Sequence, residues 1–258
     1  MSKFAGAAAY YQTFRPGIPE EVARTLVEAA RRDAPATTLL DLGTGTGQVV
    51  QALHPYFADI VAVDPDKELL RLAETNLSGV AGLRLVQARA EDFAPAEGWK
   101  ASLVTICRAF HWMDQDLVLR RLSDQVAPSG VVAVFGDSSF WAADNDWKKA
   151  VRAVIQQFLG EERRAGSGTF KHHDKPYSEI LAESPFNRVA EIALPVRRTW
   201  TRETILGYLY STSFAARHLF GDQLEDFEAA VTAVLAEYSS DNTYFEDNEF
   251  LIRFGRRP

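Results

Sequence analysis

A glycine-rich segment carries the strongest chemical signal in the chain. Residues 38–42 are a short apolar run that predicts a strand, and a predicted helix follows at 47–53. The segment that joins them reads Asp41-Leu42-Gly43-Thr44-Gly45-Thr46-Gly47. Glycines adopt positive φ and let a ligand approach the backbone closely, and the start of a helix offers free N–H groups. The segment therefore predicts a ligand-binding loop.

The spacing of the glycines and a second acidic residue limit the kinds of ligand that this loop could bind. A dinucleotide-binding loop has the pattern G-x-G-x-x-G/A, but the sixth position is Gln48 counted from Gly43 and Val50 counted from Gly45. This disfavours a nicotinamide-dependent dehydrogenase. Asp64 ends the next predicted strand, 21 residues after Gly43. An acid there can accept hydrogen bonds from both hydroxyls of a ribose, which indicates an adenosine ligand without a 2′-phosphate.

Strand-like and helix-like segments alternate through the first half of the chain. This alternation predicts an α/β fold with a parallel sheet, and the continuous apolar strands are typical of a sheet covered by helices on both faces. In such sheets ligands bind at the carboxyl ends of the strands. Helices are expected at 19–32, 47–53, 66–77 and 114–126, and strands at 38–42, 59–63, 83–87, 102–107 and 130–135.

The second half has a different pattern, without an internal repeat or a low-complexity linker. Residues 144–187 and 201–238 are predicted to be mostly helical, with a Gly/Ser loop at 165–169 and breaks near Gly207 and Gly221. Strands are expected at 188–200 and 244–256. We therefore expect a single domain over 1–258, with a binding core at 1–136 and a region at 137–258 that adds substrate-cap insertions and the last two strands.

Composition excludes several classes of protein. The chain has 258 residues, with 35 acidic and 28 basic side chains and a net charge of −7. This balance disfavours a nucleic-acid partner. A single cysteine, Cys107, excludes a disulfide framework and is expected to be a small core residue. The absence of a long apolar run and of a convincing signal peptide predicts a cytoplasmic protein without a membrane span.

Four segments, in the same order, resemble the class I S-adenosylmethionine-dependent methyltransferases. The small-molecule branch that is similar to trans-aconitate methyltransferase (methyltransferase type 11) is the best match, over residues 10–136. The resemblance implies a Rossmann-like, mostly parallel seven-stranded sheet with an antiparallel last strand and a helical cap from C-terminal insertions. The segments are Tyr11 to Pro19 (YQTFRPGIP), the glycine segment with Asp64, Ala88 to Phe93 (ARAEDF) and Arg108 to Asp114 (RAFHWMD).

The resemblance implies that S-adenosylmethionine is the cofactor and assigns residues to its two ends. Asp41 would hold the methionine amino group and Asp64 the ribose diol. Pro65 would flank the adenine, and Glu91 or Asp92 would contact its amino group. The residues implied at the methionine end are Tyr11, Arg15, Asp41, Gly43, Thr44, Gly45, Arg108 and Ala109, and those at the adenosine end are Asp64, Pro65, Ala90, Glu91 and Asp92.

His111 is the candidate catalytic residue. Methyl transfer from a sulfonium releases a neutral sulfur, so the protein has mainly to align the acceptor. A base is needed only when the acceptor is a hydroxyl that must lose its proton early. His111 follows the fourth predicted strand and could be that base, or it could position the substrate or hold the loop. No metal is expected, because the neighbouring His172 and His173 point in different directions on a regular element.

The predicted cap contains two groups of residues with alternative interpretations. The aromatic residues there are interpreted as core packing, although they could also face a substrate. The acidic residues near the end are interpreted as a solvated strand-end face, although they could attract a cationic acceptor. The aromatic set is Phe140, Trp141, Trp147, Trp200, Tyr208 and Tyr210, and the acidic set is Asp241, Glu246, Asp247 and Glu249.

The sequence thus predicts an S-adenosylmethionine-dependent methyltransferase that acts on an O or N atom of a small molecule. Two alternatives stay open at this point: a non-catalytic protein that binds S-adenosylmethionine, and an NAD-type oxidoreductase on a similar sheet. The expected partner is a small-molecule methyl acceptor. The sequence leaves open whether the protein is a monomer or a homodimer.

Overall fold

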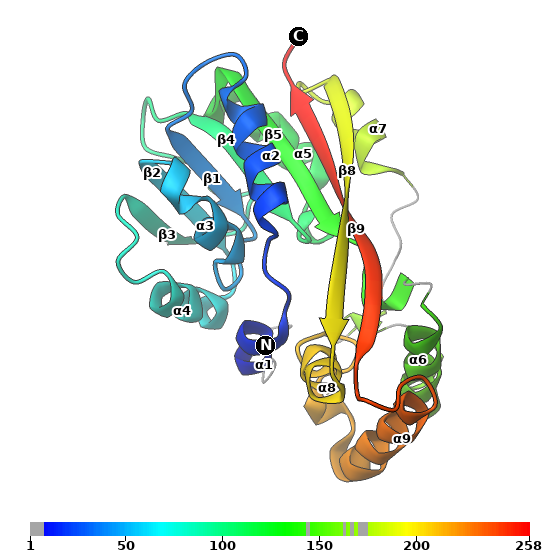
Figure 1. The fold of residues 1–258 in the computed structure, drawn as a ribbon. Helices are drawn as coiled ribbons and strands as arrows, with labels where there is room; N and C mark the ends of the chain where they lie inside the picture. The colour runs from blue at the N-terminus through cyan, green and yellow to red at the C-terminus, as the bar shows by residue number, and fades with distance from the viewer. Residues whose placement is uncertain (1–7, 143–144, 162–163, 166–167, 170–174) are drawn as a thin grey trace. The chain divides into compact units, whose positions relative to one another are not determined.

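The structure is a computed structural model that describes residues 8–142, 145–161, 164–165, 168–169 and 175–258 (Figure 1). It divides into two compact units. The unit here named the sheet unit comprises Gly17–Asp137, His173–Leu194 and Phe250–Pro258, and the unit named the helical unit comprises Met1–Pro16, Ser138–His172 and Pro195–Glu249. Two long strands, β8 and β9, contribute residues to both units.

The main sheet has seven strands in the order β3-β2-β1-β4-β5-β9-β8. β1 pairs in parallel with β2 and β4, and β9 pairs antiparallel with β5. The expected mostly parallel sheet with an antiparallel last strand is therefore confirmed. The strands are β1 (Thr38–Leu42), β2 (Asp59–Asp64), β3 (Leu83–Gln87), β4 (Ala101–Cys107), β5 (Val126–Asp137), β8 (Arg188–Trp200) and β9 (Tyr244–Arg256).

Helices cover both faces of the sheet in the sheet unit. Figure 1 shows α2 in front of the sheet and α5 behind it. Leu40 and Leu42 of β1 share one buried cluster with Leu119 of α5 and Leu181 of α7. The α-helices are α2 (Glu20–Arg31), α3 (Gln48–Leu53), α4 (Lys67–Asn76), α5 (Gln115–Gln125) and α7 (Tyr177–Ala182), and the 3-10 turns are η1 (His54–Tyr56) and η2 (Phe110–Trp112).

The helical unit has an aromatic core. The six aromatic residues expected in the cap all lie in or against one buried cluster, which confirms that they pack together. Its α-helices are α1 (Ala8–Phe14), α6 (Asp146–Leu159), α8 (Arg202–Tyr210) and α9 (Leu224–Ala236), and its 3-10 turns are η3 (Phe140–Ala142), η4 (Arg217–Leu219) and η5 (Gly221–Gln223).

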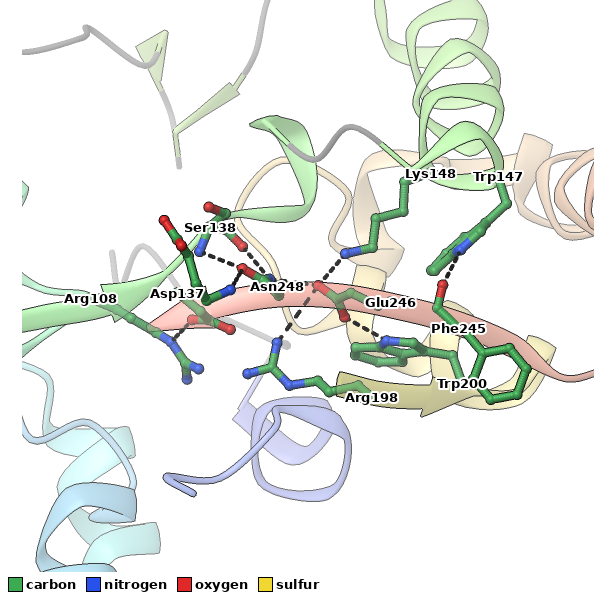
Figure 2. A network of polar contacts seen from close by, with 11 residues as sticks. Arg108, Asp137, Ser138, Trp147, Lys148, Arg198, Trp200, Phe245, Glu246 and Asn248 are labelled. Atoms are coloured by element: carbon green, nitrogen blue, oxygen red, sulfur yellow. Dashed lines mark hydrogen bonds and ion pairs between the residues drawn. The ribbon is translucent and has the colours of Figure 1, made fainter. Parts of the chain in front are cut away.

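A buried polar network joins the elements of the helical unit (Figure 2). Glu246 of β9 is only 2% exposed and forms an ion pair with the equally buried Lys148 of α6. Trp200 Nε1 donates a hydrogen bond to Glu246 Oε2 over 2.6 Å, and Arg198 Nη1 forms an ion pair with Glu246 Oε1 over 3.7 Å. The interpretation of Glu246 as part of a solvated face is therefore wrong, because alternate residues of β9 point into this core.

A local prediction about Gly207 is also wrong. α8 continues through Gly207 instead of breaking there. A Cβ atom at this position would lie 2.3 Å from Phe14 Cγ, so the glycine permits close packing of α1 rather than ending a helix. The stretch 144–187 contains the predicted helices, α6 and α7, and Arg164–Ala165 (β6) pairs antiparallel with Gly168–Thr169 (β7) where a loop was expected.

The structure bears in one respect on membrane insertion. Within the described ranges, none of the helices combines the length and apolar character that a membrane crossing requires.

Candidate functional site

The turn after β1 is held by the neighbouring strand. The N–H groups of Gly43 and Thr44 both donate to the Val63 carbonyl of β2, over 2.8 and 3.0 Å. Gly43, Gly45 and Gly47 all have positive φ. At Gly43 a Cβ atom would also lie 2.5 Å from Ala109 Cβ, so the turn after β1 directly contacts the segment after β4. The loop is thus held by β2 and by the segment after β4, at the carboxyl ends of adjacent strands.

Asp64 ties this turn to the end of β2. Its Oδ2 accepts a hydrogen bond from Gly45 N and its Oδ1 accepts one from Asp66 N, both over 2.8 Å. The side chain is only 6% exposed, and burial raises its pKa against the opposing effect of these two hydrogen bonds. Each carboxylate oxygen has a second lone pair, so Asp64 can order the loop and still accept from a ligand hydroxyl.

Asp41 is the most deeply buried acid of the site. It is 1% exposed, and its Oδ1 accepts a hydrogen bond from Thr105 Oγ1 over 2.7 Å. Burial raises the pKa of Asp41 to about 6, although the hydroxyls of Thr44 and Thr105 oppose the change. Among the buried atoms that the structure describes, Asp41 Oδ2 and Thr44 Oγ1 have no hydrogen-bond partner of normal geometry. An acceptor of this kind suits a ligand ammonium group.

The two acidic residues after β3 that could contact the adenine, Glu91 and Asp92, differ in their burial and in their contacts. Glu91 is 6% exposed, forms an ion pair with Arg89 over 3.1 Å and accepts a hydrogen bond from Asp114 N over 2.8 Å. It therefore connects the segment after β3 to the start of α5. Asp92 and Pro65 are exposed, and Ala90 is partly buried. Asp92 thus has the freer carboxylate for a ligand, while Glu91 has a clear structural role.

The segment after β4 contains the candidate base. His111 lies in the short turn η2, is partly exposed, and its ring centroid is 4.7 Å from that of Trp112. Ala109 is buried against the glycine turn. Cys107 ends β4, and burial raises the pKa of its thiol to about 12, so it does not provide a reactive thiolate.

Tyr11 and Arg15 belong to the helical unit. Arg15 Nε donates to Ser211 Oγ over 3.0 Å, and its guanidinium carbon lies 4.9 Å from the Tyr11 ring centroid and 5.1 Å from that of Tyr208. Arg15 therefore contacts Tyr208 of α8, Ser211 just after this helix, and the Tyr11 ring. The contact of Tyr11 and Arg15 with the methionine end of a cofactor stays a prediction.

Two residues of the site were missed by sequence reasoning. Thr105 pairs in register with Asp41 across β1 and β4, which only the strand register reveals. Asp137 ends β5 and forms an ion pair with Arg108 over 2.6 Å, although the β5 strand was expected to end at Phe135. No group of three or more potential metal ligands occurs within the described ranges, and His172, His173 and Asp174 lie outside them.

Comparison with known proteins identifies the family to which the segment around the glycine turn is similar. Residues 40–134, from β1 into β5, match the family model described as a methyltransferase domain. The chain contains a type 11 methyltransferase domain. The match covers the glycine turn and the ends of β2 and β4, which are the parts that form the site.

Individual relatives agree with this family. A probable S-adenosylmethionine-dependent methyltransferase of Saccharomyces cerevisiae is 28% identical over 137 residues, which are 52% of this chain and 44% of that protein. An uncharacterised methyltransferase of Mycobacterium tuberculosis is 31% identical over 127 residues, 49% of each chain. The chain thus spans about half the length of the curated relatives it matches.

A solved structure supports the fold over almost the whole chain. The structure of a candidate type II methyltransferase from Anaeromyxobacter dehalogenans aligns with 95% of this chain and 98% of its own, with a TM-score of 0.64. The identity is 24%, so this similarity supports the fold alone.

Proposed function

We propose that this methyltransferase domain uses S-adenosylmethionine to methylate an O or N atom of a small molecule. The observation that carries the proposal is the pair of buried carboxylates, Asp41 and Asp64, on the two strands that hold the glycine turn. Their placement suits a ligand with an ammonium group at one end and a ribose at the other. The family match over the same residues supports this choice of ligand.

Different residues of the site would bind different parts of the cofactor. Bound S-adenosylmethionine supplies an electrophilic methyl group. Asp41 would hold the ammonium group, while Asp64 would accept from the ribose hydroxyls. The N–H groups of Gly43, Thr44 and Gly45 are already used within the protein, so the loop offers its carbonyl groups and a close approach instead. Binding thus fixes the methyl donor, and alignment of the acceptor can supply most of the rate.

The state of Asp41 makes cofactor binding depend on pH. Only the ionised carboxylate can pair with the ammonium group, and burial raises its pKa to about 6. We expect the affinity for S-adenosylmethionine to be about tenfold lower at pH 5 than at pH 8, since about a tenth of Asp41 is ionised one unit below its pKa. Calorimetric titration across this range measures the effect, and a flat profile would contradict it.

Asp41→Asn is the matched variant for this pH dependence. At pH 8 this variant should bind S-adenosylmethionine more weakly than the wild type does, and its affinity should not change between pH 5 and pH 8. The folded-state pKa of Asp41 lies above the unfolded value of 3.8, so its stabilising contribution is complete below pH 3.8 and is lost as the pH rises through about 6. At pH 8 the free energy of unfolding of the variant should therefore be up to about 3 kcal/mol higher than that of the wild type.

His111 gives a separate prediction about the acceptor. If the acceptor is a hydroxyl and His111 takes its proton, His111→Ala should lower the turnover about 10²- to 10⁴-fold, with the affinity for S-adenosylmethionine within threefold of the wild type. Methylation of an amine acceptor needs no early proton loss and should decrease far less. A variant that loses cofactor affinity more than turnover would assign His111 to positioning.

A transfer assay tests the proposed activity. Purified protein is incubated with S-adenosylmethionine labelled in the methyl group and with panels of hydroxyl, carboxyl and amine compounds of low molecular mass. Label in an O- or N-methyl product supports the proposal. Binding of S-adenosylmethionine without transfer to any compound would favour a non-catalytic binding protein. Turnover that requires a nicotinamide and ignores S-adenosylmethionine would exclude the proposal.

A further inference from the structure

Arg108 has an unusual backbone conformation at the carboxyl end of β4. Its φ is +53°, and its N–H donates to the Phe135 carbonyl of β5 over 2.9 Å. Non-glycine residues rarely adopt this left-handed conformation. Residues held in this way concentrate at functional sites, where the surrounding structure compensates for the strain.

Three neighbours in the sheet unit hold the Arg108 side chain. Its Nε donates a charge-assisted hydrogen bond to Asp137 Oδ1 over 2.6 Å, as Figure 2 shows. Its guanidinium carbon lies 5.3 Å from the ring centroid of Phe250, the β9 residue in register with Asp137. Gly136 gives it room, because a Cβ atom there would lie 3.1 Å from Arg108 Cγ. The arginine is thus held along its length, and its side chain is only 17% exposed.

The position of Arg108 links this arrangement to the binding loop. The next residue, Ala109, contacts the glycine turn, since a Cβ atom at Gly43 would lie 2.5 Å from Ala109 Cβ. Arg108 therefore belongs to the same sheet edge as Asp41. An ammonium acceptor and a guanidinium at one edge are complementary to an amino acid, which carries an ammonium and a carboxylate on one carbon.

We propose that Asp137 is a positioning residue that orients the Arg108 guanidinium toward the carboxylate of the cofactor's methionine part. The inference rests on the proposed function, since it concerns the same cofactor. A guanidinium is planar and has donors on more than one edge. A bond from Nε to Asp137 fixes the plane, while another edge can meet a ligand carboxylate. Asp137 also balances the arginine charge at this largely buried position.

Two substitutions separate orientation from charge. Asp137→Asn keeps an oxygen that can accept from Arg108 Nε, whereas Asp137→Ala removes it. Two ligands distinguish binding of the amino-acid part from binding of the adenosine part, because S-adenosylhomocysteine has the amino-acid part and 5′-methylthioadenosine lacks it. We expect Asp137→Ala to weaken S-adenosylhomocysteine about tenfold in calorimetric titration and to leave 5′-methylthioadenosine within twofold. Asp137→Asn should restore S-adenosylhomocysteine to within threefold of the wild type.

The same titrations identify the results that would overturn the proposal. If Asp137→Ala weakens both ligands equally, the pair only stabilises the fold. If neither affinity changes, or if Asp137→Asn is as weak as Asp137→Ala, Asp137 does not orient Arg108 for this ligand. Failure of the proposed function looks different, because the wild-type protein would then bind neither ligand.

Discussion

Asp64→Ala is expected to weaken the binding of S-adenosylmethionine about 10- to 150-fold. The substitution removes a charge-assisted acceptor for the ribose hydroxyls, and hydrogen bonds to charged groups contribute about 1.5–3 kcal/mol each. It also removes the bonds that the Asp64 carboxylate accepts from Gly45 and Asp66. The loss should therefore extend to S-adenosylhomocysteine and to 5′-methylthioadenosine, since all three ligands contain the ribose. Calorimetric titration measures the three affinities.

Asp59→Ala is the matched control, because Asp59 is an acid at the opposite end of the same strand. Its carboxylate pairs with Arg84 over 2.7 Å and accepts from Trp99 Nε1 over 2.8 Å, at the amino end of β2. We expect this variant to bind like the wild type. A change of less than threefold in Asp64→Ala, or an equal change in both variants, would remove Asp64 from the ribose site.

Glu246→Ala is expected to lower the free energy of unfolding by about 3–5 kcal/mol, the cost of leaving a buried charge without its partner. The substitution leaves the buried Lys148 ammonium without this carboxylate and removes the acceptor of the Trp200 indole N–H. Trp147 and Trp200 belong to the surrounding cluster, so denaturant unfolding followed by tryptophan fluorescence reports on this region.

Asp247→Ala provides the control on the same strand. Asp247 is 75% exposed and pairs with Arg197, which is 69% exposed, over 3.2 Å. Exposed ion pairs contribute about 0–1 kcal/mol, so this variant should unfold close to the wild type. Equal unfolding midpoints for the two variants would mean that burial of Glu246 adds nothing to stability.

The sheet was predictable because its strands are apolar runs, as in β1, or alternate apolar and polar residues, as in β8. The expected strands at 38–42, 83–87, 188–200 and 244–256 agree with β1, β3, β8 and β9 residue for residue. β5 was harder to predict, because it begins at Val126 and continues through Pro128, where sequence rules predicted that a helix would stop. Propensity rules do not see the pairing of Val126 with Ala101 that extends this strand.

The site was predictable where one local segment forms it. The glycine turn, Asp41 and Asp64 lie within two strands and their turns, and the motif identified them. Thr105, Asp137 and the buried state of Glu246 depend on contacts between distant segments, which spacing along the chain does not reveal. Gly207 shows the same limit, since a glycine that ends a helix and one that receives an aromatic ring look identical in the sequence.

The most direct test of the central claim is a calorimetric titration of the purified wild-type protein with S-adenosylmethionine and S-adenosylhomocysteine at pH 8, with NAD and NADP as controls. A type 11 methyltransferase domain with the buried pair Asp41 and Asp64 should bind the first two with micromolar affinity and neither nicotinamide nucleotide. Binding of a nicotinamide nucleotide, together with no heat from S-adenosylmethionine or its product, would contradict the account.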